Sequence, residues 1–348
     1  MELFELTRPE MEEAVSAIGM KPFRGRQIFR WLYQELTTDL SLMTDISKSG
    51  REELATRFTV QPLTEPEAFT SADGTEKLRF TLDDGAVIEA VIIPEKGRVT
   101  LCVSTQVGCP LGCLFCRTGS LGFTRDLTVR EIVGQHWAAQ KRLAESGKRV
   151  TNIVFMGMGE PLLNLANTVK SAHIMMDDLG FNLSNRRVTI STIGIPDKLD
   201  ELGGQASVNI ALSLHGTTDE KRQAIMPATK NWPLKDLLAA LRRFPLPPRK
   251  KILIEYVLLD GVNDSTAEAR QLVKIARSLN AKINLIPFNT FDHAPYAPST
   301  AAAIQAFQQT IWDAGLTVII RKSRGDESLA ACGQLGYVPD AGDLEEDD

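Results

Sequence analysis

From residue 99 onward the chain alternates between short apolar runs and amphipathic stretches, and this alternation restricts the fold more than any other feature of the 348 residues. It predicts parallel strands joined by right-handed crossover helices, in an open sheet or a barrel. The predicted strands cover residues 99–105, 152–157, 187–193, 208–215, 252–259, 283–288 and 317–322. The predicted helices cover residues 129–145, 165–179, 234–244, 267–279 and 300–314.

Polar and reactive side chains collect after the carboxyl ends of these predicted strands. In a parallel α/β barrel the loops at that end build the active site. Ser213 and His215 alternate with apolar neighbours, so both point to one face, the barrel interior or its mouth. The polar tips are the cysteine loop 109–116, the turn 157–161, Ser191 and Thr192, 213–216, 260–264 and Asn289. We therefore expect a single site at this end of the sheet.

The loop after the first of these strands carries Cys109, Cys113 and Cys116 in a C-x3-C-x2-C run. A four-iron, four-sulfur cluster is usually held by four cysteines, so three thiolates leave one iron open to another ligand. The alternative is structural zinc, which needs four ligands and usually draws them from two separated pairs. No second pair exists in the sequence, although spacing alone does not decide the fourth ligand. The run favours a [4Fe-4S] cluster.

The sequence before residue 99 predicts two smaller units. Residues 1–65 form a helical module with exposed arginines that would suit an RNA backbone, or that simply caps the next domain. Residues 66–98 form a β-hairpin extension with its turn at Asp84-Gly85. Glu89 interrupts an apolar row on the second strand, and burial there would suit this carboxylate to accepting a proton. Residues 99–322 form the α/β barrel, and residues 323–348 a final segment with an acidic end.

Charge and hydropathy narrow the class of protein. The net charge of −5 argues against coating nucleic acid through bulk charge, and much of the acidity lies in residues 340–348. Basic clusters at 21–30, 242–251 and 321–324 keep a nucleic-acid substrate possible, although each alone is more often a solvated face. The sequence has no apolar run long enough for a membrane span and no signal peptide. We expect a cytoplasmic protein with reduced, chemically active cysteines and no membrane partner.

Several motifs together resemble one family, the radical S-adenosylmethionine (SAM) RNA adenine methyltransferases of the RlmN and Cfr type. The resemblance covers nearly the whole chain, and the C-terminal ACGQL segment is its most specific part. The motifs are FRGRQI (23–28), CVSTQVGC (102–109) running into the cluster loop, 157–163, Ser213-Leu214-His215, IPFN (286–289), RGD (324–326) and ACGQL (331–335).

This resemblance implies a fold, cofactors and a set of binding residues. The fold is an incomplete (β/α)6 radical SAM barrel with a small N-terminal helical domain and a short β extension. The cofactors are a [4Fe-4S] cluster on Cys109, Cys113 and Cys116, and two SAM molecules per turnover. The implied SAM-binding residues are Phe115, Gly159, Glu160, Ser191, Ser213, Leu214, His215 and Asn289. Of the departures from the family pattern, Arg117 and Asp126 put only fine substrate contacts in doubt.

The resemblance also assigns the remaining reactive residues. Cys332 is first methylated by SAM, and a radical from a second SAM then removes a hydrogen atom from that methyl group. The resulting carbon radical adds to adenine, whose ring carbon is too poor a nucleophile to attack SAM directly. Glu89 matches the group that accepts the ring proton. Cys102 would attack the sulfur of Cys332 and release the product as a disulfide forms.

The implied substrate is carbon 2 of an adenosine in 23S rRNA near the peptidyl transferase centre, with the adenosine 3′ of the tRNA anticodon as a second candidate. The implied electron donor is a flavodoxin-type protein. One alternative is Cfr-like methylation of carbon 8. Two others lie in different classes: a non-catalytic iron–sulfur RNA-binding protein, which would leave Cys102 and Cys332 without a task, and a radical SAM activase, which would not need the basic helical module.

Overall fold

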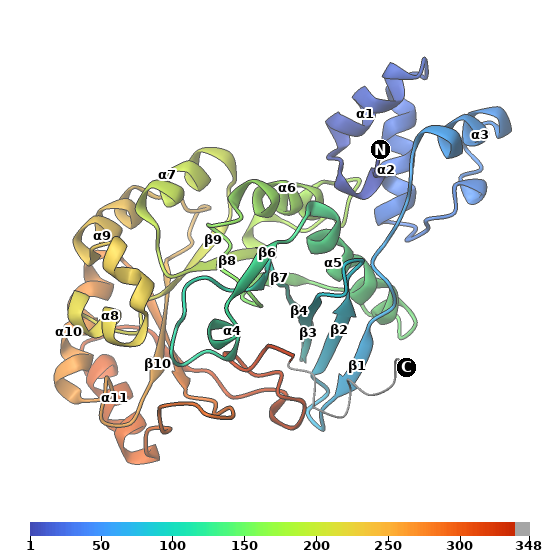
Figure 1. The fold of residues 1–348 in the computed structure, drawn as a ribbon. Helices are drawn as coiled ribbons and strands as arrows, with labels where there is room; N and C mark the ends of the chain where they lie inside the picture. The colour runs from blue at the N-terminus through green and yellow to red at the C-terminus, as the bar shows by residue number, and fades with distance from the viewer. Residues whose placement is uncertain (338–348) are drawn as a thin grey trace.

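An open sheet of ten strands forms the centre of the computed structural model, which describes residues 1–337 (Figure 1). The strands lie in the order β1-β2-β3-β4-β7-β8-β9-β10-β11-β12, and those from β4 to β12 run parallel. Their bounds are β4 Arg98–Cys102, β7 Asn152–Phe155, β8 Val188–Thr192, β9 Asn209–Ser213, β10 Leu253–Leu258, β11 Lys282–Pro287 and β12 Val318–Ile320. All seven predicted strands are confirmed. β11 has the predicted length but begins one residue earlier, and the other six are shorter than expected. The acidic end at 340–348 lies outside the described residues.

Helices connect these strands and lie on the outer side of the curved sheet (Figure 1). The five predicted helices are confirmed as α5 Val129–Ala144, α6 Leu165–Met176, α9 Leu234–Arg243, α10 Thr266–Ser278 and α11 Ala301–Asp313. Two more are α7 Pro196–Gln205 and α8 Asp219–Ile225, while the short helix α4 Arg117–Ser120 follows the cysteine loop and lines the active-site cavity. The parallel strands are buried on both faces, as in β9, where Ile210, Ala211 and Leu212 have no exposed surface. Since β12 pairs only with β11, the barrel is incomplete.

The β extension continues the barrel sheet. β1 Glu67–Thr70, β2 Glu76–Thr81 and β3 Val87–Glu95 are antiparallel, and β3 pairs with β4 from Val91↔Cys102 to Glu95↔Arg98. The predicted hairpin is confirmed, with Gly85 at φ +80° in its turn. A second hairpin, β5 Gln106–Gly108 with β6 Phe123–Asp126, brackets the cysteine loop and was not predicted. Gly108 is required there, because a Cβ would lie 2.0 Å from the carbonyl oxygen of Gly122.

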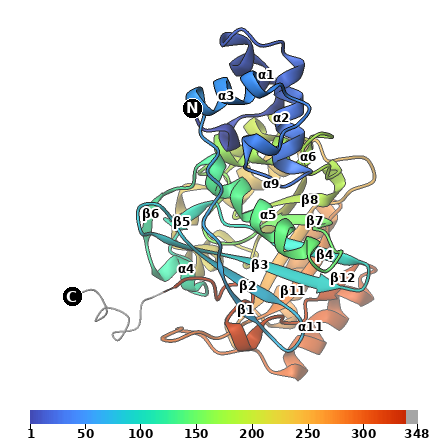
Figure 2. The same cartoon turned by 90° about the vertical axis from the view of Figure 1, so that its right-hand side faces the viewer.

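The N-terminal helices α1 Arg8–Ala17, α2 Phe23–Tyr33 and α3 Lys48–Arg57 form a layer beside α5 and α6 (Figure 2). The Trp137 indole joins the two layers by donating to the carbonyl of Leu32 at 2.9 Å. The arginines expected to face RNA are paired within the module: Arg26 with Glu12 at 3.1 Å and Arg30 with Asp45 at 3.2 Å. Among residues 1–337, no helix combines the length and apolar character needed to cross a membrane.

Candidate active site

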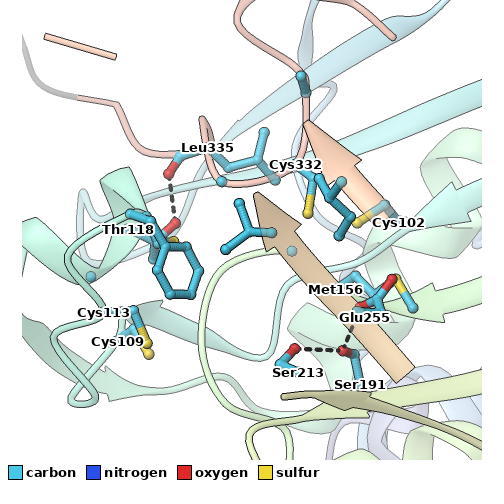
Figure 3. Close-up of a pocket in the computed structure, with 18 of the residues that line it drawn as sticks. Cys102, Cys109, Cys113, Thr118, Met156, Ser191, Ser213, Glu255, Cys332 and Leu335 are labelled. Atoms are coloured by element: carbon cyan, nitrogen blue, oxygen red, sulfur yellow. Dashed lines mark hydrogen bonds between the residues drawn. The ribbon is translucent and has the colours of Figure 1, made fainter. Parts of the chain in front are cut away.

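One cavity of about 150 Å³ opens at the carboxyl ends of the parallel strands (Figure 3). The cysteine loop, the strand tips and the C-terminal segment 325–337 all contribute to its wall. All predicted site residues except Glu89 and Leu214 line it: Cys102, Cys109, Cys113, Phe115, Cys116, Gly159, Glu160, Ser191, Ser213, His215, Asn289 and Cys332. The structure therefore brings together residues that are more than 200 positions apart in the sequence.

The cysteine loop fits an iron–sulfur cluster better than a zinc ion. Within residues 1–337, no group of three His, Cys, Asp or Glu side chains converges as ligands of one metal ion must. A zinc ion would need every ligand within roughly 2.0 to 2.3 Å of one point, whereas cysteines spread around a cluster each bind a different iron. Burial raises the pKa of the Cys109 thiol to about 12 and also raises the pKa of Cys113 and Cys116. Coordination by iron would hold these thiols as thiolates.

The glycines of the turn after β7 are needed for packing against the chain itself. A Cβ at Gly157 would lie 2.6 Å from the hydroxyl of Ser104, and one at Gly159 would lie 2.5 Å from the side chain of Gln106. Gly159 also has φ +98°, a conformation that favours glycine. Neither position therefore has room for a side chain, and both glycines line the cavity.

Glu160 is a buried carboxylate in the cavity wall. Its oxygens accept hydrogen bonds from the backbone N–H of Leu162 at 3.1 Å and of Ile193 at 3.0 Å. Burial raises its pKa to about 7, against the lowering effect of these bonds and of the Thr192 hydroxyl. A carboxylate held in this way suits a cationic group, such as the ammonium of an amino acid.

His215 follows β9 in a left-handed conformation, with φ +55°. Its Nδ1 accepts a hydrogen bond from the N–H of Val257 at 3.0 Å, so the proton of the neutral ring is on Nε2. Burial lowers its pKa to about 3, which keeps the ring neutral. Phe115 packs edge-to-face against it, with ring centroids 4.8 Å apart. The side chain of Leu214 is fully buried and contributes no surface to the cavity.

Sequence reasoning missed two buried charged residues of this site. Glu255 in β10 accepts a hydrogen bond from the Ser191 hydroxyl at 3.1 Å and lies 3.8 Å from Arg321. The sequence could have pointed to Glu255, because it is the only charged residue in the predicted strand ILIEYVLL. Arg222 in α8 is 1% exposed and donates to the carbonyls of Ile193 at 2.6 Å and Leu214 at 3.2 Å, which ties the tips of β8 and β9 together. It lies in the polar helix DEKRQAI, where nothing marks it.

Cys102 and Cys332 line the same cavity although they are more than 200 positions apart in the sequence. Cys102 ends β4, Cys332 lies in the C-terminal segment, and both are free thiols (Figure 3). Burial raises the pKa of Cys102 to about 12 and of Cys332 to about 11, while the charge of Arg321 opposes the shift in both. The amide of Asn289 holds the segment by donating to the Cys332 carbonyl at 3.0 Å.

Glu89 is placed beside this cavity and does not line it. The side chain is 1% exposed, and one of its oxygens lies 3.2 Å from the ammonium of Lys77 and 3.8 Å from Arg79. Its other oxygen accepts a hydrogen bond from the N–H of Gly336 at 2.8 Å. The C-terminal segment therefore contacts both Glu89 and the cavity.

Two family models match the chain: the ribosomal RNA large subunit methyltransferase N-terminal domain over residues 1–60, and the radical SAM superfamily over residues 103–273. A curated relative from Pelobacter propionicus, "Dual-specificity RNA methyltransferase RlmN", is 46% identical over 98% of this chain and 97% of its own length. Its namesake from Geotalea uraniireducens is 45% identical over 96% of each chain.

A solved structure is also similar over almost the whole chain. It is a radical SAM methyltransferase from Sphaerobacter thermophilus, which is 41% identical and superposes with a TM-score of 0.90. The match covers 96% of this chain and 99% of that one, so both the barrel and the N-terminal helices have counterparts there.

Proposed function

The chain belongs to the RlmN family of radical SAM methyltransferases, and we propose that it methylates carbon 2 of an adenosine in 23S rRNA and, as a second substrate, in tRNA. As a member of the radical SAM superfamily it uses a [4Fe-4S] cluster and SAM. Two relatives carry the name "dual-specificity RNA methyltransferase", which supports RNA as the substrate class. The electron donor in this proposal is a flavodoxin-type protein.

The observation that carries the proposal is the pair of free thiols, Cys102 and Cys332, in the same cavity as the three cluster cysteines. A ring carbon of adenine is a poor nucleophile and does not displace the methyl group of SAM. A protein thiol can accept that methyl group first and act as a carrier. Neither an iron–sulfur binding protein nor an activase would require this pair.

The cavity offers a place for each cofactor. Cys109, Cys113 and Cys116 would hold the cluster, and Glu160 and Ser191 would bind the amino-acid part of SAM with Phe115 beside its adenine. The remaining proposed SAM contacts are Gly159, Ser213, His215 and Asn289. The resemblance also implies Leu214, but this residue has no exposed surface and lies outside the cavity wall. When bound, the cluster and SAM together supply an electron, a methyl group and a radical that removes a hydrogen atom.

The later steps belong to three residues of the chain. The methyl carbon is carried on the sulfur of Cys332 and becomes bonded to the adenine ring. Glu89 then takes the ring proton, which requires that this buried carboxylate become accessible from the cavity. The thiolate of Cys102 attacks the sulfur of Cys332, and the sulfur–carbon bond breaks with its electron pair on the methylene carbon. That carbon takes up a proton to become the methyl group of the product, and a disulfide joins the two cysteines. A thiol reductant restores the two cysteines.

Two single variants test this order of events. Cys332→Ala should contain no S-methyl group and should never become attached to RNA. Cys102→Ala should still carry the methyl group on Cys332 and form the RNA adduct, but should fail to release it. A band on denaturing gels that collapses to protein size after ribonuclease treatment would identify the adduct.

Normal turnover of Cys102→Ala without such a band would contradict the release step. Mass mapping of methyladenosine in 23S rRNA and tRNA, from cells with and without the protein, distinguishes carbon 2 from carbon 8. It also shows which RNA is modified.

A further inference from the structure

A second, larger cavity of about 690 Å³ lies at the other end of the strands from the cysteine loop. Most of its charged residues stand at the amino ends of parallel strands: Arg98 begins β4, Arg186 precedes β8, residues 249–251 precede β10 and Lys282 begins β11. Arg321, Lys322 and Arg324, which follow β12, also line the cavity. Every parallel strand contributes to its lining, so the cavity occupies the amino end of the barrel interior.

This basic cavity is lined by nine cationic side chains and two carboxylates. Both carboxylates are engaged, Glu95 with Arg98 and Glu255 with Arg321. Arg186, Lys250 and Lys282 form no ion pair with any carboxylate of residues 1–337. An excess of seven positive charges on a chain of net charge −5 is a local concentration that favours an anionic ligand.

The cations also repel one another. Burial and the nearby charges of Arg186, Lys282 and Arg187 lower the pKa of Lys250. Lys250 donates to the carbonyl of Arg186 at 3.1 Å, which draws two of the cationic segments together. Such crowding costs free energy in the free protein, and a bound polyanion would relieve it.

The basic cavity meets the active site through a shared wall. Ile93, Met156, Glu255 and Arg321 line both cavities, so the two cavities adjoin at these side chains. The other approach, over the cysteine loop, is crossed by the C-terminal segment: Arg117 N–H donates to Gly333 at 2.8 Å. The C-terminal segment therefore covers part of that approach to Cys102, and the basic cavity adjoins the active site from the other side.

We propose that the basic cavity binds the phosphodiester backbone of the RNA substrate beside the target nucleotide. This inference rests on the RNA methylation proposed above and adds the place of contact. An acidic electron-carrier protein is disfavoured as the occupant, because it must dock near the cluster and the cavity lies at the opposite end of the strands. Separate phosphates on a flexible strand can also enter a concave cavity, which the convex surface of a folded protein cannot do.

The test uses the triple variant Arg186→Gln, Lys250→Gln, Lys282→Gln in the reconstituted holoenzyme. A matched control, Lys148→Gln, Arg149→Gln, Lys274→Gln, removes the same charge from exposed positions that line neither cavity. The probe is an anticodon stem–loop transcript, whose affinity is measured at several salt concentrations. Because each phosphate contact to a single strand contributes about 0.7 to the slope of log affinity against log salt, the triple variant should lose roughly two. The control should keep the wild-type slope.

Two further measurements separate the possible failures. Cleavage of SAM without RNA, driven by dithionite, should be unchanged in the triple variant, and RNA should protect Lys250 and Lys282 of the wild type from acetylation while leaving Lys274 reactive. An unchanged salt slope in the triple variant, or unprotected lysines in an enzyme that methylates RNA, overturns this inference alone. Reduction by flavodoxin that weakens while RNA binding is unaffected also overturns it. A wild type that neither binds nor methylates RNA overturns the proposed function with it.

Discussion

The strand tips that line the active site and the C-terminal segment that carries Cys332 are held in different ways. Buried polar side chains join the tips: Arg222 binds the carbonyls of Ile193 and Leu214, and Asn263 donates to the carbonyls of His215 and Val257. The described part of the segment, 325–337, contains no strand and only a short 3-10 turn. It is held by individual hydrogen bonds from Asn289, Arg117, Thr118 and Gln334.

This difference matches the tasks that the two regions have in the proposed reaction. The cofactor site must keep one geometry, and disrupting a buried, charged hydrogen-bond network is costly. The segment must bring Cys332 first to SAM and later to the adenosine. Most of the hydrogen bonds that hold it are neutral, and each of these contributes only about 0.5 to 1.5 kcal/mol, so no single one of them fixes the segment.

The largest expected effect on activity comes from removing one of the three cluster cysteines. Cys113→Ala should abolish both iron binding and formation of 5′-deoxyadenosine, because the cluster loses one of its three ligands. Cys332→Ala serves as the matched control and should retain both, since its thiol belongs to the moving segment. Iron analysis and chromatography of the SAM products measure the two outcomes. Stoichiometric zinc with no iron in native protein would instead support the alternative metal.

Most of the residues that line the active-site cavity could be predicted from the sequence. Strand alternation placed the polar tips at one end of the sheet, and the resemblance selected Glu160, Ser191 and His215, which do line the cavity. Local periodicity says nothing about residues that act from outside a strand tip, so Arg222 was missed. The sequence did mark the basic clusters 242–251 and 321–324, which supply six of the nine cations of the basic cavity. It could not show that the barrel brings them together with Arg98, Arg186 and Lys282.

The contact of Glu89 with the segment could not be predicted either. Its hydrogen bond to Gly336 joins residues 247 positions apart, and no local pattern encodes such a pairing. The expectation of a single carboxylate on an apolar strand face was sound, because the side chain is buried. Its role as a base stays a prediction.

Glu89→Gln tests the link between the two regions. The amide keeps the shape and can still accept from Gly336, but it cannot take a proton, so turnover should fall by a factor of about 100 or more. The RNA adduct should still form. Glu67→Gln is the control, because this exposed carboxylate lies 3.4 Å from the same Arg79 and has no proposed role. Single-turnover kinetics on an RNA stem–loop would measure both, and an unchanged rate would show that another group takes the proton.

The smallest expected effect comes from removing hydrogen bonds that hold the C-terminal segment in place. The Gln334 amide donates to the carbonyl of Thr290 at 2.8 Å, and its oxygen accepts from the N–H of Ala331 at 3.3 Å, one residue before Cys332. Gln334→Met keeps the length of the side chain and removes both bonds, which should weaken docking of the segment by about 1 to 2 kcal/mol and slow turnover by roughly five- to thirtyfold. Iron content and SAM cleavage without RNA should not change, because Gln334 does not line the active-site cavity. Limited proteolysis should cut the segment faster in the variant. Loss of the cluster in Gln334→Met would show that the two regions are one structural unit and that the contrast between them is wrong.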